Sequence, residues 1–150
     1  MNAPSPVNRQ RLESFLNSLT GTDFDLEFKE YQNELVYPTE SGVIFINQNN
    51  ENILQIRGQW RGITADDESF ATLVSLVQEC NLHRSGPKAY MLPMDNHQRF
   101  SVGAEVNLIV SQGATECQLA AFYETALTMI MGLFQDLDTA APQLVTWRNH

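Results

Sequence analysis

The 150-residue sequence has few basic residues, and their scarcity limits what the protein can bind. Nine Lys and Arg stand against eighteen Asp and Glu, which gives a formal net charge of -9 at pH 7. This balance argues against DNA or an anionic membrane as the main partner, because phosphate groups are bound by cationic surface. A regulator that binds nucleic acid is therefore the function class that the composition favours least.

Long hydrophobic runs are also absent. The longest apolar stretch, residues 119–134, contains Glu124, Thr125 and Thr128 and falls short of the roughly 20 residues that a membrane-spanning helix needs. It therefore predicts a helix in a protein core or interface. Residues 1–11 contain no apolar run, so we expect no secretory signal. Together these features predict a cytoplasmic protein that does not bind a membrane.

Cysteine is scarce, and the two present, Cys80 and Cys117, each lie in a predicted helix. We expect both to be buried, reduced thiols, as is usual in a reducing compartment, while sequence alone leaves a disulfide between them open. Cys80 and His83 have the spacing of metal ligands, but a zinc site needs about four, so Cys117 and His97 would have to complete it. A cysteine–histidine nucleophile pair would lack an orienting residue. We favour a core position for Cys80 and a helix-end position for His83.

The motifs of common catalytic sites are missing as well. Residues 58–62 contain two glycines but have neither the spacing nor the following Lys of a phosphate-binding loop. No Gly-x-Ser-x-Gly elbow and no zinc-protease pair of histidines is present. We therefore assign no catalytic residue, no metal ligand and no cofactor.

Hydrophobic periodicity predicts an α+β fold with an antiparallel sheet, in the order α-β-β-(β)-α-β-β-α. Helical spacing occurs at 6–20, 65–81 and 119–137, and strand-like patterns at 24–28, 35–37, 43–46, 54–60, 88–94 and 100–110. The connections between neighbouring strands are too short for parallel crossovers. We expect a single domain over residues 1–150, with a loose N-terminal tail at 1–5 and a C-terminal tail at 143–150.

Two helix starts carry the pattern of a capping box, in which a side chain at the helix start and one three residues later bond to each other's backbone. The pairs are Thr64 with Asp67, and Thr115 with Gln118. The last strand should turn alternate residues to the core: Phe100, Val102, Ala104, Val106 and Leu108. Glu105 then falls on the other face, where it is either solvated or paired with a basic side chain across the sheet.

Five basic residues fall on predicted strands or strand ends, and they could converge on one face of the sheet. These residues are Arg57, Arg61, Arg84, Lys88 and Arg99. Convergence would create a site for a small anion or an acidic peptide. The alternative is a set of ordinary surface ion pairs, each contributing less than about 1 kcal/mol.

The last helix has an apolar stripe wider than one sheet usually covers. Beyond the residues that should face the sheet, it carries Ala121, Met129, Met131 and Leu133. Methionine adapts readily to interfaces, and Gly132 would allow close approach of another backbone. The stripe predicts a protein interface, most simply that of a symmetric homodimer. The alternative is a thick core within one chain.

The segment from Trp60 to Pro142 resembles the YbjN family of bacterial sensory-transduction regulators. The residues that carry this resemblance are Trp60, Asn81, the sequence Pro87-Lys88-Ala89-Tyr90, Glu105, Gly113 and Gln118-Leu119. The resemblance implies a fold like that of type III secretion chaperones. It implies no catalytic residues, because none are defined for the family.

These observations predict a non-enzymatic cytoplasmic interaction protein, a chaperone-like or regulatory adaptor. Its expected partners are a second copy of itself and another, unidentified protein, with no nucleic acid and no membrane. The alternative function is a small-anion binding protein or an enzyme that uses the strand-borne basic residues.

Overall fold

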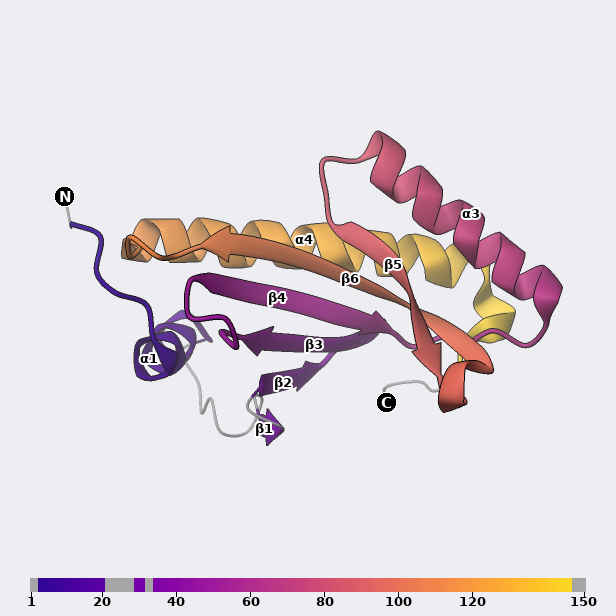
Figure 1. The fold of residues 1–150 in the computed structure, drawn as a ribbon, viewed down its shortest axis with the longest axis horizontal. Helices are drawn as coiled ribbons and strands as arrows, with labels where there is room; N and C mark the ends of the chain where they lie inside the picture. The colour runs from indigo at the N-terminus through magenta and orange to yellow at the C-terminus, as the bar shows by residue number, and fades with distance from the viewer. Residues whose placement is uncertain (1–2, 21–28, 32–33, 147–150) are drawn as a thin grey trace.

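The computed structural model describes residues 3–20, 29–31 and 34–146, which form a six-stranded antiparallel sheet and the helices that pack on it (Figure 1). The elements are α1 (Arg9–Thr20), β1 (Lys29–Tyr31), β2 (Glu34–Pro38), β3 (Gly42–Asn47), β4 (Ile53–Trp60), α3 (Asp67–His83), β5 (Lys88–Met94), β6 (Arg99–Ile109) and α4 (Glu116–Ala140), with short 3-10 turns at Asp95–His97 and Pro142–Leu144. The predicted α+β class and element order are confirmed. The strand predicted at 24–28 lies outside the described residues.

The strand order in the sheet is β1-β2-β3-β4-β6-β5, and every neighbouring pair is antiparallel. Both predicted tails are tied to this framework where the structure describes them. Ser5 forms a bridge with Ala114, and Val145 forms one with Gly62, next to the buried Leu144. The ordered chain therefore extends beyond the tail boundaries expected from sequence.

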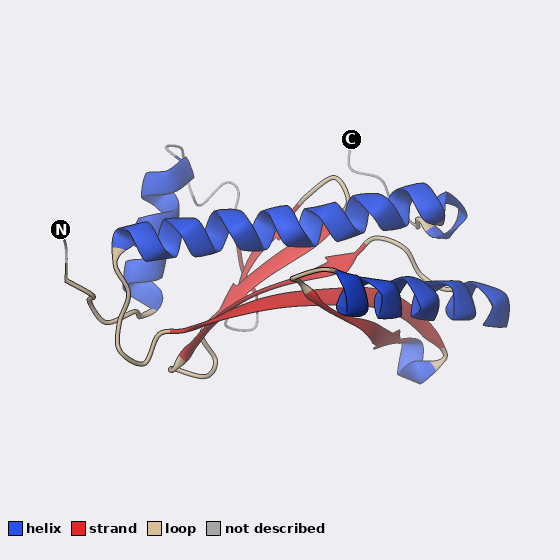
Figure 2. Ribbon diagram, turned by 90° about the horizontal axis from the view of Figure 1, so that it is seen from above, coloured by secondary structure: helices blue, strands red, loops and turns tan. Residues whose placement is uncertain are grey.

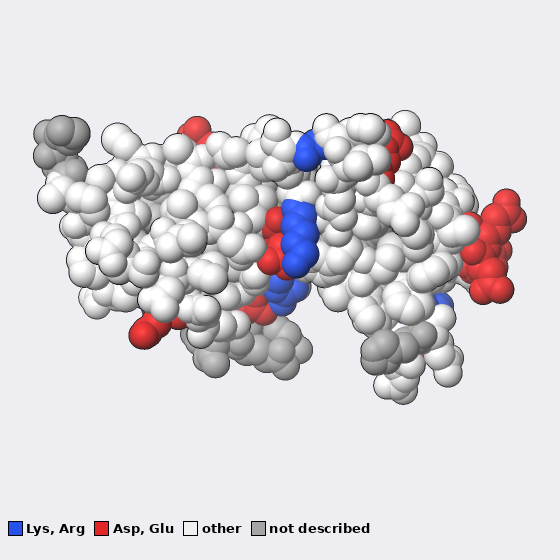
Figure 3. Space-filling view, turned by 45° about the horizontal axis from the view of Figure 1, so that its top comes forward, with Lys and Arg blue, Asp and Glu red and all other residues white. Residues whose placement is uncertain are grey.

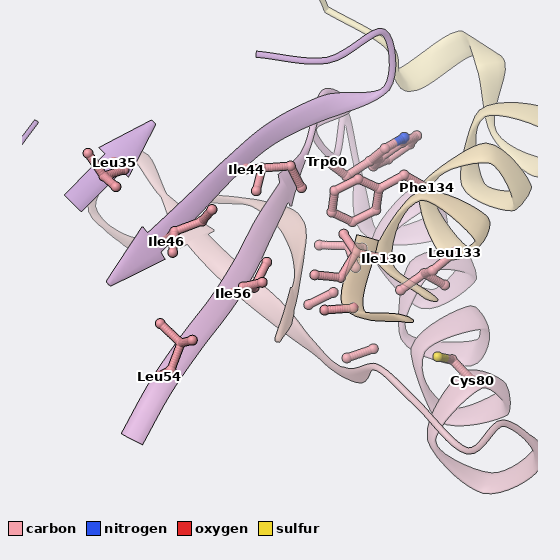
Figure 4. Close-up of a cluster of buried hydrophobic side chains, with 14 of the residues drawn as sticks. Leu35, Ile44, Ile46, Leu54, Ile56, Trp60, Cys80, Ile130, Leu133 and Phe134 are labelled. Carbon is pink, nitrogen blue, oxygen red and sulfur yellow. The ribbon is translucent and has the colours of Figure 1, made fainter. Parts of the chain in front are cut away.

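The helices gather on one face of the sheet. In Figures 1 and 2, α4 runs along the sheet behind β4 and β6, α3 lies beside β5, and α1 stands near the opposite end. The strands turn alternate apolar residues to this face, and Figure 4 shows several of them directed toward α4. They include Leu35, Ile44, Ile46, Leu54, Ile56 and Trp60, each at most 2% exposed. Together with the buried residues of α1, α3 and α4, these strand residues form the hydrophobic core.

Small residues allow α4 to approach the sheet closely. Gly58 lies opposite Ala104, which in turn lies opposite Ala89, so three small residues form a row across β4, β6 and β5. A Cβ at Gly58 would stand 2.8 Å from Ile130 Cγ2 and 2.9 Å from Phe134 Cε2. The lack of a side chain at position 58 is therefore what lets Ile130 and Phe134 seat against β4.

The predicted register of β6 is confirmed at its centre. Val102 and Ala104 are fully buried, and Val106 and Leu108 pack on the edge of the core. Ser101, which alternates with these residues, is buried too, and its hydroxyl donates to the carbonyl oxygen of Trp60 at 3.0 Å.

One of the two predicted capping boxes is confirmed. Thr115 and Gln118 cap α4 reciprocally, as expected. At α3 the predicted capping box of Thr64 and Asp67 was wrong, since Asp66 is the N-cap residue and Ser69 completes the box. Thr64 instead bonds to the backbone of Phe100, donating its N–H and accepting through its hydroxyl, so it joins the helix approach to β6.

The apolar stripe on α4 is largely covered within the single chain. Leu133 is only 2% exposed. Met131 is half-buried and its sulfur accepts a bond from the Thr39 hydroxyl at 3.7 Å, while a Cβ at Gly86 would lie 2.7 Å from the Met129 sulfur. Of the four candidate interface residues, Ala121 is exposed, Met129 and Met131 are half-buried and Leu133 is buried. Leu133 therefore belongs to the core, because neighbours flank this part of α4, while the other three residues stay partly accessible.

By length and composition alone, α4 could also cross a membrane. In the structure its apolar face packs on the sheet through Leu119, Ile130, Phe134 and Leu137, all of them buried. This face of the helix thus belongs to the core, which is one of the two roles, core or interface, that its sequence predicted.

Two glycine substitutions should have opposite effects on stability. Gly58→Ala should lower the free energy of unfolding by about 1–3 kcal/mol, because the new methyl overlaps Ile130 and Phe134. Gly132→Ala should raise it by up to about 1 kcal/mol, because nothing lies within 4 Å of the added methyl and alanine favours a helix. Urea unfolding followed by circular dichroism measures both. Equal effects of the two substitutions would contradict the assigned packing of α4.

Candidate functional site on the open face of the sheet

The face of the sheet turned away from α4 has no helix packed over it within the described ranges (Figure 1). It is formed by the strand residues that alternate with the core. Apolar and polar side chains share it: Val36, Val43, Phe45, Gln55, Arg57, Gln59, Tyr90, Leu92, Glu105 and Asn107. We call this surface the open face.

An ion pair between β4 and β2 lies at the centre of the open face. Arg57 bonds to Glu34 through both ends of its guanidinium, with Nη2 2.6 Å from Oε1 and Nε 3.1 Å from Oε2. The Arg57 Cζ also stands 4.0 Å from the centre of the Phe45 ring. Bidentate pairing and stacking on an aromatic ring fix the guanidinium in one orientation.

Side-chain amides extend this pair across the sheet. Asn47 donates from Nδ2 to Glu34 Oε2 at 2.8 Å and to Gln55 Oε1 at 3.0 Å. Gln55 Nε2 donates in turn to Glu105 Oε2 and to Asn107 Oδ1, each at 3.1 Å. Asn107 Nδ2 closes the chain on Glu105 Oε2 at 2.8 Å.

These contacts define a polar network, which consists of Glu34, Asn47, Gln55, Arg57, Glu105 and Asn107. Glu34 and Asn47 are buried although they lie on the open face. Of the two roles considered for Glu105, the structure shows neither alone. Glu105 lies opposite Arg57 on β4 and opposite Lys88 on β5. Its carboxylate nevertheless accepts its hydrogen bonds from the side-chain amides of Gln55 and Asn107.

Tyr90 lies beside the polar network on β5. Its ring passes over Gly103 on β6, where a Cβ would lie 2.3 Å from the ring. Burial raises the pKa of the Tyr90 phenol, the negative charge of Glu105 raises it further, and Arg57 acts in the opposite direction. Burial and the carboxylate of Glu105 thus favour the neutral form of the phenol.

The five basic residues for which the sequence left convergence open do not form one site. Arg61 pairs with Asp138, which also accepts bonds from the Trp60 indole and the Ser41 hydroxyl. Arg84 pairs with Asp136, and Arg99 pairs with Asp95.

Arg57 and Lys88 lie on the open face, opposite Glu105 on its two neighbouring strands. Figure 3 shows the resulting band of basic and acidic atoms across an otherwise mostly uncharged surface. Of the two alternatives that the sequence left open, an anion site and ordinary ion pairs, the four arginines show the second, because each has a carboxylate of its own.

Sequence reasoning missed four members of the polar network: Glu34, Asn47, Gln55 and Asn107. The available signal was their alternation with core residues on neighbouring strands. Using it requires the register between β2, β3, β4 and β6, which the sequence pattern does not specify.

The two cysteines differ in environment. Cys80 is buried as expected, where burial raises the pKa of its thiol, and its sulfur lies 3.6 Å from the carbonyl oxygen of Pro87. Cys117 is exposed, so the prediction that both are buried was wrong for it. Neither forms a disulfide. Across the part of the chain that the structure describes, no three His, Cys, Asp or Glu residues gather as a metal site would require.

Comparison with known proteins agrees with the resemblance seen in the sequence. The family model YbjN, described as "Putative bacterial sensory transduction regulator", matches residues 34–139. The chain belongs to the YbjN family. The matched segment contains the whole polar network, whereas α1 precedes it.

The crystal structure of YbjN from E. coli has the same fold. It superimposes with a TM-score of 0.78 over 97% of this chain and 100% of that chain, at 18% sequence identity. No curated protein matches the sequence.

The Glu34–Arg57 pair should show strong coupling in a double-mutant cycle. Glu34→Leu and Arg57→Leu should each lower the free energy of unfolding by about 1–3 kcal/mol, because each leaves a half-buried charge without its partner. The double variant should lose less than the sum of the two single losses. Urea titrations of the four proteins give the coupling directly. Additive losses would show that the pair is not formed in solution.

Tyr90 should ionise only at strongly alkaline pH. Subtracting the phenolate absorbance titration of Tyr90→Phe from that of the wild type isolates this residue, and its midpoint should lie above the ordinary value near 10. Glu105→Gln should lower the midpoint by removing the nearby negative charge. Because the folded-state pKa is raised, the stability from the neutral phenol is present below about pH 10 and declines as the pH rises through the folded pKa. A midpoint at or below the ordinary value would contradict the burial of this ring.

Proposed function

We propose that this YbjN-family chain is a non-enzymatic regulatory adaptor of the cytoplasm that binds a protein partner through the open face. The observation that carries the proposal is the polar network itself. It holds a fixed guanidinium and two carboxylates in the middle of a sheet face over which the described residues place no helix.

The arrangement suits recognition better than turnover. Glu34, Gln55, Arg57 and Glu105 bond to one another, so their geometry is set before any partner arrives. A preformed surface loses little conformational entropy on binding. The apolar side chains of Val43, Phe45 and Leu92 lie around the network and supply contact area. A polar centre within apolar surroundings gives specificity and orientation to a protein interface.

Two further findings support the proposal. The family description is that of a regulator. The free thiols of Cys80 and Cys117, the second of them exposed, are typical of a reducing compartment. The alternative of an anion-binding protein or enzyme has lost its basis in convergent basic residues, since separate carboxylates pair Arg57, Arg61, Arg84 and Arg99.

The test is affinity capture from the native cells with three forms of the protein, each checked by circular dichroism. Val43→Lys places a charge on the open face, and Leu82→Lys places the same charge on α3, where Leu82 is 77% exposed. Wild type and Leu82→Lys should retain a common partner, while Val43→Lys should recover about tenfold less of it, a loss typical of a charge placed in an interface. Equal recovery by Val43→Lys and Leu82→Lys would overturn the assignment of the open face.

A further inference from the structure

The sheet is incomplete beside β6. This strand runs over eleven residues, but β5 pairs with it only from Arg99 to Glu105. From Val106 to Ile109, β6 has β4 on one side and no described strand on the other. Figure 1 shows β6 continuing well past the start of β5, with α4 behind it.

The backbone groups of this segment have a defined direction. In an antiparallel ladder, successive residues direct their N–H and C=O to opposite sides of the strand. The Val110 N–H donates to Asn52 C=O at 2.8 Å on the β4 side. Even-numbered residues of β6 therefore face β4, and Asn107 and Ile109 direct their N–H and C=O to the uncovered edge.

The outer edge of β5, in contrast, has a side chain bonded to its backbone. Asn81 on α3 donates from Nδ2 to the Ala89 carbonyl oxygen and accepts from the Ala89 N–H, both at 2.8 Å. One side chain thus closes the outer edge of β5 at Ala89. The described residues provide no equivalent cap for Asn107 and Ile109, whose edge groups stay available for pairing.

The same end of the molecule leaves one flank of α4 uncovered. In the second half of the helix this flank is covered, since Met129 lies against Gly86 and Asp136 pairs with Arg84. Two turns earlier, none of the residues that the structure describes provides such cover. A groove of about 410 Å³ lies there, lined by Leu108, Ile109, Gly113, Ala114, Gln118, Ala121, Phe122 and Thr125. Ile109 is 77% exposed at its rim.

We propose that a second copy of this chain fills this place, with the β6 strands of the two copies pairing antiparallel about a two-fold axis at Leu108. In that register Asn107 of each copy lies opposite Ile109 of the other. All the edge-directed N–H and C=O groups of these residues are then bonded. An axis at Asn107 would place Ile109 of one copy opposite Glu105 of the other, which already pairs with β5. An axis at Ile109 would place Asn107 opposite residue 111, beyond the end of β6, and leave its backbone groups without a strand partner.

The chemistry of the groove favours a second copy as the occupant. A chain of net charge -9 repels its copy wherever acidic surfaces meet. None of the residues that line the groove carries a charge. Glu116 in the first turn of α4 is bonded to Arg11 on the side of α1. A two-fold axis also places the two α4 helices on the same side of the joined sheet, where Ala121 and Phe122 of both copies can cover each other.

The first test measures oligomeric state by light scattering at tens of micromolar. Wild type should have twice the mass of the 17.0 kDa chain. Ile109→Pro should halve it, because proline removes an edge N–H to which no described strand is paired. Ile109→Thr keeps that N–H and should remain dimeric. A monomeric wild type, or a dimer that persists in Ile109→Pro, would overturn the proposal.

The second test fixes the register. Single cysteines replace Asn107, Leu108 or Ile109 in a Cys80→Ala, Cys117→Ser background. Directly opposed residues of a non-hydrogen-bonded pair have Cα atoms about 4.5 Å apart, which permits a disulfide. Leu108→Cys should cross-link under mild oxidation and the other two should not. Cross-linking at 107 or 109 in its place would overturn the proposed axis, and failure at all three would overturn edge pairing.

Discussion

The close seat of α4 against β4 is the constraint on which the rest of this structure depends. Because Gly58 has no side chain, Ile130 and Phe134 can contact the sheet. The small side chains of the Gly58–Ala104–Ala89 row also project little from this face between β4 and β5. One long helix can then bury most of the apolar side chains that the strands turn to it. With the described helices gathered on that side, none of them covers the opposite face, where the polar residues bond to each other.

Asp138 shows how the fold ties this packing to its charges. Its carboxylate, near the end of α4, accepts bonds from the Trp60 indole, the Ser41 hydroxyl and Arg61. The end of β4, the turn before β3 and the last turns of α4 are thereby held at one point. Because Arg61 is paired with Asp138, it is not available to bind an anion. Its position at a strand end had made it a candidate for such a site.

Periodicity predicted the fold well because burial on one face determines it. The alternation in β6 and the spacing of Leu119, Ile130 and Phe134 required a sheet covered by a helix, and the Thr115–Gln118 box marked where that helix begins. Sequence reasoning failed where the answer depends on what lies beside an element. The flanks of α4 looked unpartnered because nothing in the sequence places Thr39 or Gly86 against Met131 and Met129. The polar network could not be predicted for the same reason. Its residues lie next to one another only when β2, β3, β4 and β6 pair in the register that the structure shows.

The pairing of the arginines also determines which acidic side chains carry the excess negative charge of the surface. Each of Arg57, Arg61, Arg84 and Arg99 is matched to a carboxylate, and those pairs contribute no net charge. The unmatched acids then dominate the surface, among them Asp66, Asp67 and Glu68 at the start of α3, which the positive end of that helix favours. Both proposed interfaces lie on neutral regions, where the acidic surfaces of two such chains would not repel each other. These regions are the open face, with one band of balanced charge, and the uncharged groove beside β6.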